Sequence, residues 1–556
     1  MSEHKKRSEA AIAASNHWAN KRVKTLEDQK ASESIPLLPV NPDAGTDKQN
    51  PILIEDIKST VDHRVPETCR SSPIRLLYNP SYNDSESVAA NKDTLMIEEL
   101  IGSKDLKETF QFNFSIDLPF FLTYLHPDFS KEKKKITFIS GSKVLLPELP
   151  DAEFVREHFN VHEVIANVPN KFGTHHTKMM INFFEDDTVE IVIMTANLTK
   201  LDFVGLTQMC WRSGRLKKDS DPSEENTKFK RDLCAYIKRY GDDALDNLSE
   251  IVNKYVFCGI DVELVASTPG SYDISDLKDD DEIYGYGKLY QILRRNGLLL
   301  DNQESKLHYN VLAQISSISY PFATKGKDTA SIFSHLICPL IFSGNQPGPS
   351  FLAPGSRSFQ RHQKLNNYYP HIVFPSVPDV AENNVGFGAG QAVHFNYFSS
   401  QTHRNQYEQN IKPYLRRWNS SRNLSITGRE KVVPHVKLYM CDNADNWGSL
   451  KWVMMCSHNL SKQAWGSHKG SKFTTTDARK YEVASYELGV LVPERTVKLI
   501  PCYSSDHTTT ADRIPIRLPF KLPPVPYLSS DKPWSPLQDF GHIKDRYGQE
   551  YHGINS

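Results

Sequence analysis

The chain lacks the sequence patterns that mark several protein classes. Its eight cysteines form no C-x-x-C pair and show none of the Cys/His spacings of a zinc site, so we expect reduced thiols, most of them buried. No uninterrupted apolar run approaches the ~18–20 residues of a membrane span, and the N-terminus has no apolar signal segment. The sequence therefore predicts a soluble, intracellular protein with no membrane partner.

The chain also lacks a substantial net charge of either sign. Lysine plus arginine number 66 and aspartate plus glutamate 67, which leaves a formal net charge of −1. Proteins that bind nucleic acid over a broad surface are usually strongly basic, so any site for a polyanion here must be a local patch. The 556 residues exceed the roughly 250–300 that one hydrophobic core supports, so we expect at least two domains.

Aromatic residues are scarce near the N-terminus. In residues 1–70 the only aromatic side chain is Trp18, and the segment is rich in Lys, Glu, Ser and Pro. We expect it to be disordered, because it cannot bury enough apolar area to offset chain entropy. Its basic clusters, Lys5–Arg7 and Lys21–Lys24, have the form of a bipartite nuclear import signal, which predicts a nuclear protein. The alternative is a solvated basic tail.

Beyond residue 70, segments typical of strands alternate with segments typical of helices. Strands are expected at 110–114, 135–139 and 189–194, and helices at 119–125, 228–240, 287–295 and 407–418. This alternation predicts an α/β fold with covered sheets. A polar loop near residue 300 is the expected domain boundary, which divides the ordered part into 71–300 and 301–556.

An H-x-K triplet occurs five times, but only two copies are followed by the same pattern, an apolar run that ends in N-L-[ST]-K. The two copies are His176-Thr177-Lys178 with Asn197-Leu198-Thr199-Lys200, and His435-Val436-Lys437 with Asn459-Leu460-Ser461-Lys462. A single H-x-K triplet is a weak signal, and an Asn after a strand is more often a turn residue. The repeat of the whole pattern predicts two halves of one catalytic site.

Two histidines can divide the work of cleaving a phosphodiester. One imidazole attacks phosphorus to give a phosphohistidine, and the other protonates the leaving oxygen and later takes a proton from water. Lys178 and Lys437 would place ammonium groups beside the non-bridging oxygens, and Asn197 and Asn459 would add amide donors. We expect no metal and no other cofactor, because this chemistry needs none and the sequence shows no acidic spacing typical of a two-metal site.

The strings around both motifs resemble the tyrosyl-DNA phosphodiesterases of the phospholipase D superfamily. The resemblance rests on residues 172–180, 434–437, 459–466, 485–490 and 531–534, and it extends from about residue 72 to the C-terminus. It implies two similar phospholipase-D-like α/β/α domains with mixed sheets, related by a pseudo-two-fold axis, with the active site between them. It also implies hydrolysis of the bond between a tyrosine and a DNA 3′-phosphate, the remnant of a stalled topoisomerase I.

The resemblance also implies roles for individual residues. His176 would be the nucleophile and His435 the general acid and base, and the phosphate would be held by Lys178, Lys437, Asn197 and Asn459. Gln208 and Glu487 match supporting polar positions, and Glu487 is expected to reach His176 across the domain interface, where a carboxylate would fix the imidazole tautomer. Gln208 is alternatively a surface residue.

The substrate implied by the resemblance is DNA with a blocked 3′ end, single-stranded or nicked, that carries a topoisomerase I-derived peptide. Phe172 would stack on a base, or it is a core aromatic. A basic patch is expected among Lys133, Lys134, Lys135, Arg357, Arg361, Lys364, Arg416 and Arg417, with Tyr368, Tyr369 and Trp418 nearby. A monomer is expected, because one chain supplies both half-sites.

One position departs from the wider superfamily, which places an Asp five residues beyond the Lys. The first motif has Phe183 there, and the second has Asp442, which we interpret as a turn residue. Two other functions remain open: a less selective phospholipase or nuclease of the same superfamily that acts on other DNA ends, and a catalytically silent protein that binds DNA ends. The missing acid at Phe183 counts against the first, and the complete His, Lys and Asn set counts against the second.

Overall fold

The structure is a computed structural model, and it describes residues 71–554 with several gaps. The gaps are 83–87, 89, 147–151, 219–226, 301–306, 320–323, 326, 343–351, 420–426, 469–478 and 504–511. The N-terminal segment 1–70, with its expected disorder and import signal, lies outside the described residues.

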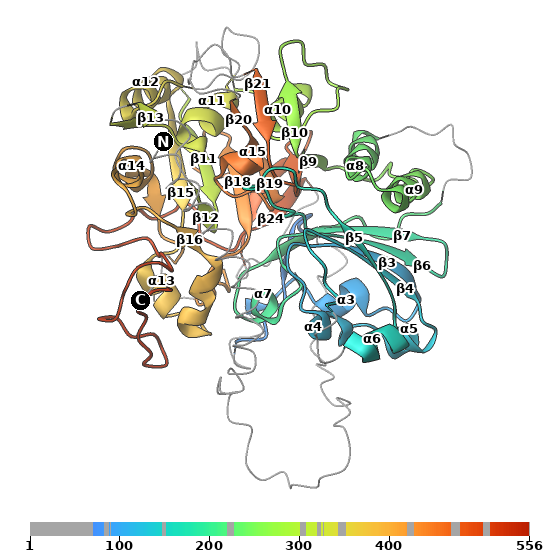
Figure 1. Cartoon of the computed structure of the whole chain (residues 1–556). Coiled ribbons are helices and arrows are strands. Elements are labelled where there is room, and N and C mark those ends of the chain that lie inside the picture. Colours follow the sequence, from blue (N-terminus) through green and yellow to red (C-terminus); the bar gives the residue numbers. More distant parts are fainter. Residues whose placement is uncertain are drawn as a thin grey trace, which may run out of the picture. The chain divides into compact units, whose positions relative to one another are not determined.

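Two large mixed sheets form the framework (Figure 1). The first sheet has eight strands in the order β2-β1-β8-β7-β6-β3-β4-β5. Their bounds are Thr94–Leu95 (β2), Arg75–Leu77 (β1), Met209–Arg212 (β8), Val189–Met194 (β7), Met179–Phe184 (β6), Leu106–Phe112 (β3), Lys135–Ser140 (β4) and Asn160–Ile165 (β5). The strands expected near 110, 135 and 189 are thus all present.

The second sheet follows the order β17-β15-β11-β18-β19-β22-β9, with β23 and β24 added beside β19. The bounds are Leu415–Arg416 (β17), Tyr368–Val373 (β15), Tyr309–Gln314 (β11), Lys437–Asp442 (β18), Leu450–Cys456 (β19), Glu487–Pro493 (β22), Glu263–Ser267 (β9), Lys498–Cys502 (β23) and Arg513–Arg517 (β24). The Pro-rich C-terminal stretch therefore contributes strand β24 in addition to extended chain.

The two sheets repeat one topology. The seven strands β1-β8-β7-β6-β3-β4-β5 match β9-β22-β19-β18-β11-β15-β17 in order. The directions match too, since β6 and β18 each pair antiparallel with both neighbours, whereas β3–β4 and β11–β15 are parallel. The chain is therefore an α/β protein built from two similar halves, as the sequence predicted.

The first strand of the second sheet in chain order is β9 (Glu263–Ser267). Strand β9 pairs antiparallel with β22 and holds the place in the second sheet that β1 holds in the first. Helix α10, Tyr286–Arg295, comes after β9 in the chain. Strand β9 thus joins the second sheet from Glu263 onward, and the domain boundary near residue 300 stays a prediction.

The central strands of both sheets are covered on both faces. Every residue of β6, β7, β18 and β22 is buried, which explains their continuous apolar runs. The flanking helices include α3 (Ile97–Ile101), α4 (Leu118–Leu122), α5 (Pro127–Lys131), α6 (Ala152–His158), α8 (Lys228–Lys238), α9 (Asp243–Val252), α12 (Ser356–Asn366), α13 (Val377–Ala381) and α14 (Gln401–Gln406). Among the described residues, no helix is long and apolar enough to span a bilayer.

The helix expected over 407–418 begins earlier, as α14 at Gln401, and is irregular. Residues Tyr407–Ile411 form a π-helical segment, Lys412–Tyr414 form a single 3₁₀ turn, and the chain then enters strand β17. Pro413 lies within the 3₁₀ turn. A proline lacks the backbone N–H that a continuing helix requires, so the helix ends there.

Candidate active site

Each H-x-K segment is held by the opposite half of the molecule. The backbone N–H of His176 donates to the carbonyl of Tyr486 at 2.9 Å, and that of His435 donates to the carbonyl of Thr207 at 3.0 Å. In the first segment a Cβ on Gly173 would lie 2.0 Å from the carbonyl oxygen of Ala484, so only glycine allows this close approach. The two motifs therefore meet at the interface between the halves.

The repeated N-L-[ST]-K pattern has a structural explanation in both copies. Thr199 is the N-cap of α7 (Lys200–Val204), and Ser461 is the N-cap of α15 (Lys462–Trp465). Each hydroxyl accepts a hydrogen bond from the backbone N–H three residues later, which satisfies a helix-end donor. The preceding Asn residues are thereby fixed between a strand end and a helix start.

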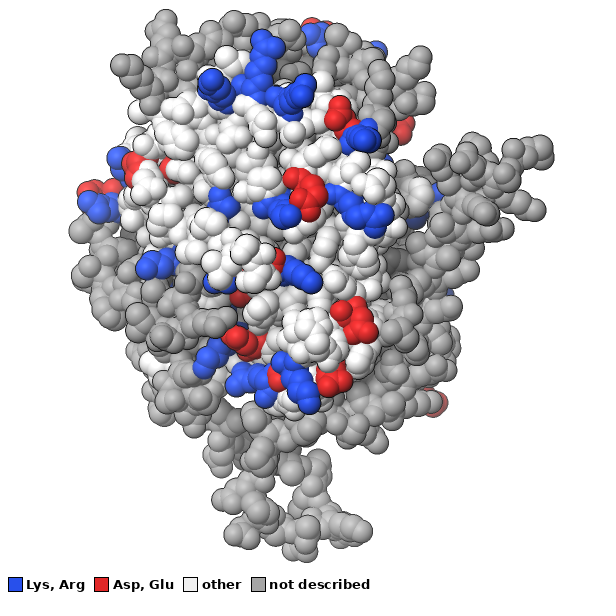
Figure 2. Space-filling view, turned by 90° about the vertical axis from the view of Figure 1, so that its left-hand side faces the viewer, with Lys and Arg blue, Asp and Glu red and all other residues white. Residues whose placement is uncertain are grey.

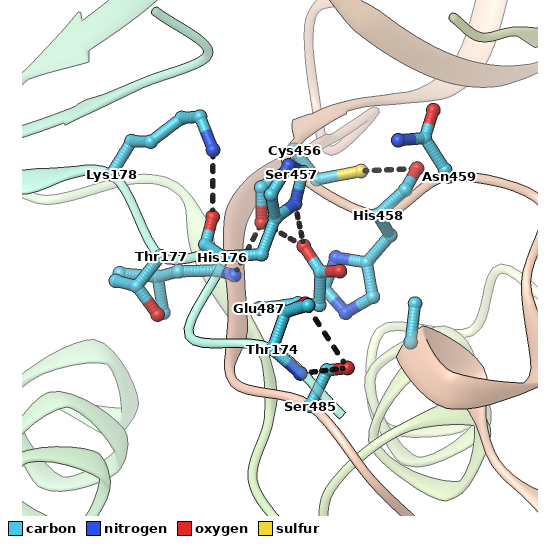
Figure 3. Close-up of polar contacts among 12 residues, drawn as sticks. Thr174, His176, Thr177, Lys178, Cys456, Ser457, His458, Asn459, Ser485 and Glu487 are labelled. Carbon is cyan, nitrogen blue, oxygen red and sulfur yellow. Dashed lines mark hydrogen bonds and ion pairs between the residues drawn. The ribbon is translucent and has the colours of Figure 1, made fainter. Parts of the chain in front are cut away.

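His176 has a carboxylate partner from the other half. Its Nδ1 lies 2.7 Å from Oε2 of Glu487, which also accepts a hydrogen bond from the hydroxyl of Ser457 (Figure 3). The Phe114 ring packs edge-on against the imidazole at 5.5 Å between centroids. A carboxylate accepts the Nδ1 hydrogen, so Nε2 carries the free lone pair that a nucleophile needs.

His435 has an equivalent carboxylate partner that the sequence did not reveal. Its Nδ1 lies 3.1 Å from Oδ1 of Asp202 and 3.0 Å from Nε2 of Gln208. Gln208 itself donates to Asp202 Oδ1 at 2.7 Å and is only 1% exposed, so it is not a surface residue. Asp202 stands three residues after Thr199, a [ST]-x-x-[DE] spacing typical of a helix start, and this was the one available signal.

Burial favours the neutral form of both imidazoles. Burial lowers the pKa of His435 to about 3, with the Lys437 charge as the next cause. Burial, followed by the charges of Lys178 and Lys437, likewise holds the pKa of His176 well below its usual value. A neutral imidazole can act as a nucleophile, and an imidazole that gains a proton can act as a general acid.

The two lysines are buried cations at the same interface. Nζ of Lys178 donates to the carbonyl of His176 at 2.9 Å, and Nζ of Lys437 donates to that of His435 at 2.5 Å. Burial lowers the pKa of Lys178 to about 8. Burial and then the Lys178 charge lower the pKa of Lys437 to about 7. An anion bound near both lysines would raise these pKa values again, so the pair favours a negatively charged ligand.

The two asparagines are held in different ways. Asn459 accepts backbone N–H groups of Ser316 and Ser317 at its Oδ1, at 3.3 and 2.9 Å, which orients its NH₂ group as the remaining donor. Asn197 donates its backbone N–H to Asp202 at 2.9 Å, and its Nδ2 lies 3.4 Å from the same carboxylate. Asp202 therefore ties Asn197, Gln208 and His435 into one unit.

Phe172 lies outside the core. Its side chain is 54% exposed, and Nζ of Lys171 lies 5.0 Å above its ring. The alternative of a core aromatic is therefore excluded. The ring stands four residues before His176 and is accessible to a ligand.

Many of the residues expected to contact DNA are buried or are paired with other residues of the chain. Tyr368 and Trp418 are buried, Arg416 donates to His371, and Arg417 forms a two-point ion pair with Asp531. Lys134 and Lys135 are also in ion pairs with acidic neighbours. On the face shown in Figure 2, basic and acidic side chains are mixed over most of the surface, and basic ones gather near the top. Exposed cations remain at Lys133 and, on α12, at Arg357, Arg361 and Lys364.

Asp442 is the last residue of a strand, and its carboxylate accepts hydrogen bonds from the turn that follows. It ends β18, the strand that Lys437 begins, so the length of the strand separates it from the site. Its two carboxylate oxygens accept the backbone N–H and side-chain amide of Asn310, at 2.7 and 2.8 Å. The backbone N–H groups of Ala444 and Trp447 also donate to it.

No metal site is evident in the described part of the chain, where no group of three His, Cys, Asp or Glu is arranged to hold an ion. Two repeated α/β halves that share paired H-x-K histidines, buried lysines and carboxylate partners define a phosphodiesterase, a class of hydrolase. The comparisons with known proteins name the family.

The sequence profile of the tyrosyl-DNA phosphodiesterases matches residues 74–528. The chain belongs to the tyrosyl-DNA phosphodiesterase family, whose members are DNA-repair hydrolases. It is 27% identical over 540 residues to a probable tyrosyl-DNA phosphodiesterase of Schizosaccharomyces pombe, covering 84% of this chain and 93% of that protein. It is 24% identical over 571 residues to tyrosyl-DNA phosphodiesterase 1 of Saccharomyces cerevisiae, covering 94% and 95%.

A solved structure shows the same fold. The crystal structure of the yeast tyrosyl-DNA phosphodiesterase matches with a TM-score of 0.64 at 22% identity, and the match covers 83% of this chain and 99% of the yeast chain. The α/β fold with two mixed sheets is thus confirmed both by the strand order and by this likeness.

Proposed function

We propose that this enzyme hydrolyses the bond between a DNA 3′-phosphate and a tyrosine of a topoisomerase I-derived peptide, through a phosphohistidine on His176. The observation that carries the proposal is the reciprocal pairing of each histidine with a carboxylate of the opposite half, His176 with Glu487 and His435 with Asp202. Family membership supports the substrate class.

In the first step, the Nε2 lone pair of His176 attacks phosphorus and the bond from phosphorus to the tyrosine oxygen breaks. The departing phenolate takes a proton from His435. The bound phosphate anion raises the pKa of His435 toward neutrality, and Asp202 accepts the Nδ1 hydrogen of the resulting imidazolium. Glu487 stabilises the positive charge that develops on the phosphorylated His176 ring.

In the second step, water attacks the phosphohistidine while His435 takes its proton. The bond from phosphorus to Nε2 breaks, which leaves DNA with a 3′-phosphate and restores His176. Lys178, Lys437, Asn197 and Asn459 hold the non-bridging oxygens through both steps. We further propose single-stranded or nicked DNA ends as substrates, no cofactor, a monomeric enzyme and a nuclear location.

The direct test uses a single-stranded oligonucleotide with a 3′-phosphotyrosine, incubated with enzyme in EDTA. Release of tyrosine and a 3′-phosphate end is expected, and His176→Ala should abolish both. Turnover of phosphatidylcholine or of unmodified DNA ends at a similar rate would instead favour a less selective phosphodiesterase. Tight binding of the oligonucleotide without turnover would favour a silent end-binding protein.

A further inference from the structure

Both chain neighbours of His176 take part in a buried polar network with two tyrosines. The ring Nε2 of His175 lies 2.9 Å from the hydroxyl of Tyr240, and the hydroxyl of Thr177 is hydrogen-bonded to that of Tyr236. The two tyrosine hydroxyls lie 3.3 Å apart. These four residues, His175, Thr177, Tyr236 and Tyr240, are called the α8 network here, because Tyr236 lies on α8 and Tyr240 just beyond its end.

The hydrogens in this network can be assigned. The Nδ1 atom of His175 lies 3.1 Å from the carbonyl oxygen of Asn113, which can only accept, so Nδ1 carries the hydrogen. Nε2 is then an acceptor, and Tyr240 must donate its single hydroxyl hydrogen to His175. Burial lowers the pKa of His175 to about 3, which keeps the ring neutral and this pattern fixed.

The same network also holds the segment that carries the carboxylate partner. The Tyr240 ring stacks on Tyr486 with centroids 4.4 Å apart and an interplanar angle of 18°. The carbonyl of Tyr486 accepts the backbone N–H of His176 at 2.9 Å, and Glu487 is the next residue. Tyr240 therefore contacts the segment that carries His176 through His175, and the segment that carries Glu487 through Tyr486.

We propose that Tyr240 and His175 are positioning residues that set the direction of the His176 ring relative to Glu487 and the phosphorus. The inference rests on the proposed function, because it concerns the nucleophile's approach to phosphorus. Attack requires the reacting atoms to be about 3–3.5 Å apart and aligned, and a displacement of about 1 Å can cost about 100-fold in rate. Both residues are buried, and their polar side-chain atoms contact Asn113, each other and Tyr236 rather than the imidazole of His176.

The test variant is Tyr240→Phe, which removes the hydroxyl and keeps the ring stacked on Tyr486. In single-turnover experiments with the full chain, formation of the His176 adduct should slow at least about fivefold, with the oligonucleotide concentration for half-maximal rate unchanged. Hydrolysis of the adduct should change less than about twofold, because the covalent bond to phosphorus then holds the ring. A purely structural role would not separate the two steps.

The matched control is Tyr255→Phe, because Tyr255 is equally buried in the same half but packs against Phe183, at the end of β6 away from the motif. It should leave both steps at wild-type rates. If Tyr240→Phe fails to fold, Tyr236→Phe removes the next hydroxyl of the network and should show the same selective loss, to a smaller degree.

The result for the wild-type enzyme tests the proposed function, and the result for Tyr240→Phe tests the positioning role. If the wild-type enzyme forms no adduct on His176, the proposed function fails. If the wild type forms the adduct and Tyr240→Phe matches it, or slows both steps equally, the positioning role is overturned. Selective slowing of adduct formation supports it.

Discussion

Asp202 lies with its Oδ1 atom 3.1 Å from Nδ1 of His435, and the two residues come from opposite halves of the molecule. The contact mirrors the one between Glu487 and His176, at 2.7 Å. Each half thus supplies one histidine and the carboxylate for the other half's histidine. His435 differs in that its Nδ1 atom also lies 3.0 Å from the side-chain amide of Gln208.

Asp202→Asn should lower kcat by about 100-fold or more, because general acid catalysis contributes 10²–10⁴-fold and the imidazolium of His435 would lose its counter-charge. The substrate KM should change little, since Asp202 does not reach the phosphate. Steady-state kinetics on the phosphotyrosyl oligonucleotide measure both.

The control for this variant is Asp442→Asn, a second buried carboxylate in the other half. It should reduce the melting temperature, because Asp442 holds a turn, and leave kcat within about twofold. Equal kcat for Asp202→Asn and wild type would contradict the acid–base pairing.

Phe172→Ala should weaken binding of the oligonucleotide substrate, since stacking of an aromatic ring on a base contributes about 1–3 kcal/mol. That range corresponds to a five- to 150-fold increase in Kd, measured by fluorescence anisotropy with His176→Ala as the common background. Phe154→Ala is the matched control, because Phe154 is also 54% exposed but lies on α6. Equal losses for both variants would show that Phe172 makes no special contact with DNA.

Anion binding should weaken as pH rises. The pKa of Lys437 is lowered to about 7 and that of Lys178 to about 8, so these two side chains lose positive charge between about pH 6 and 9. A bound anion favours the protonated lysines, so each lysine contributes up to about a tenfold loss of affinity per pH unit above its pKa. The inhibition constant of sulfate, measured across this pH range, tests the prediction, because the charge of sulfate does not change over the range. An inhibition constant that does not change with pH would show that the two lysines are not at the anion site.

The lowered pKa of Lys437 also affects stability, but in the opposite direction: anion binding weakens as pH rises, whereas the stability of the fold increases. The folded protein binds fewer protons at Lys437 than the unfolded chain between pH 7 and 10.5, so stability from this group rises with pH over that window. Lys437→Met removes the buried charge and should raise the melting temperature relative to wild type at pH 6. This difference in melting temperature, measured by circular dichroism, should be smaller at pH 9. The same difference at both pH values would contradict the lowered pKa of Lys437.

Local sequence was enough to predict those features that depend on periodicity and repetition. The strand over residues 189–194 is found with those bounds, and the two copies of the H-x-K pattern have matching local structure, since each ends in a helix N-cap. The pairing of His176 with Glu487 was expected from the family resemblance and is present.

Features that depend on distant pairing could not be predicted in the same way. Strand β9 joins the second sheet because it pairs with β22, which lies more than two hundred residues further on, and no local signal marks that choice. Trp418 and Tyr368 looked available for DNA but fill the core, since an aromatic side chain carries no sequence mark of its burial. Asp202 was overlooked because a capping spacing does not tell which imidazole the carboxylate will meet.

The central claim is that His176 becomes covalently bonded to the 3′-phosphate of DNA. The most direct measurement is mass spectrometry of a peptide digest after the His435→Asn variant has reacted with the 3′-phosphotyrosyl oligonucleotide, since loss of the base that activates water should let the adduct persist. We expect a phosphate-linked nucleotide on His176, and we expect this adduct to be absent from the variant that also carries His176→Ala. A peptide containing His176 that stays unmodified while tyrosine is released would contradict it.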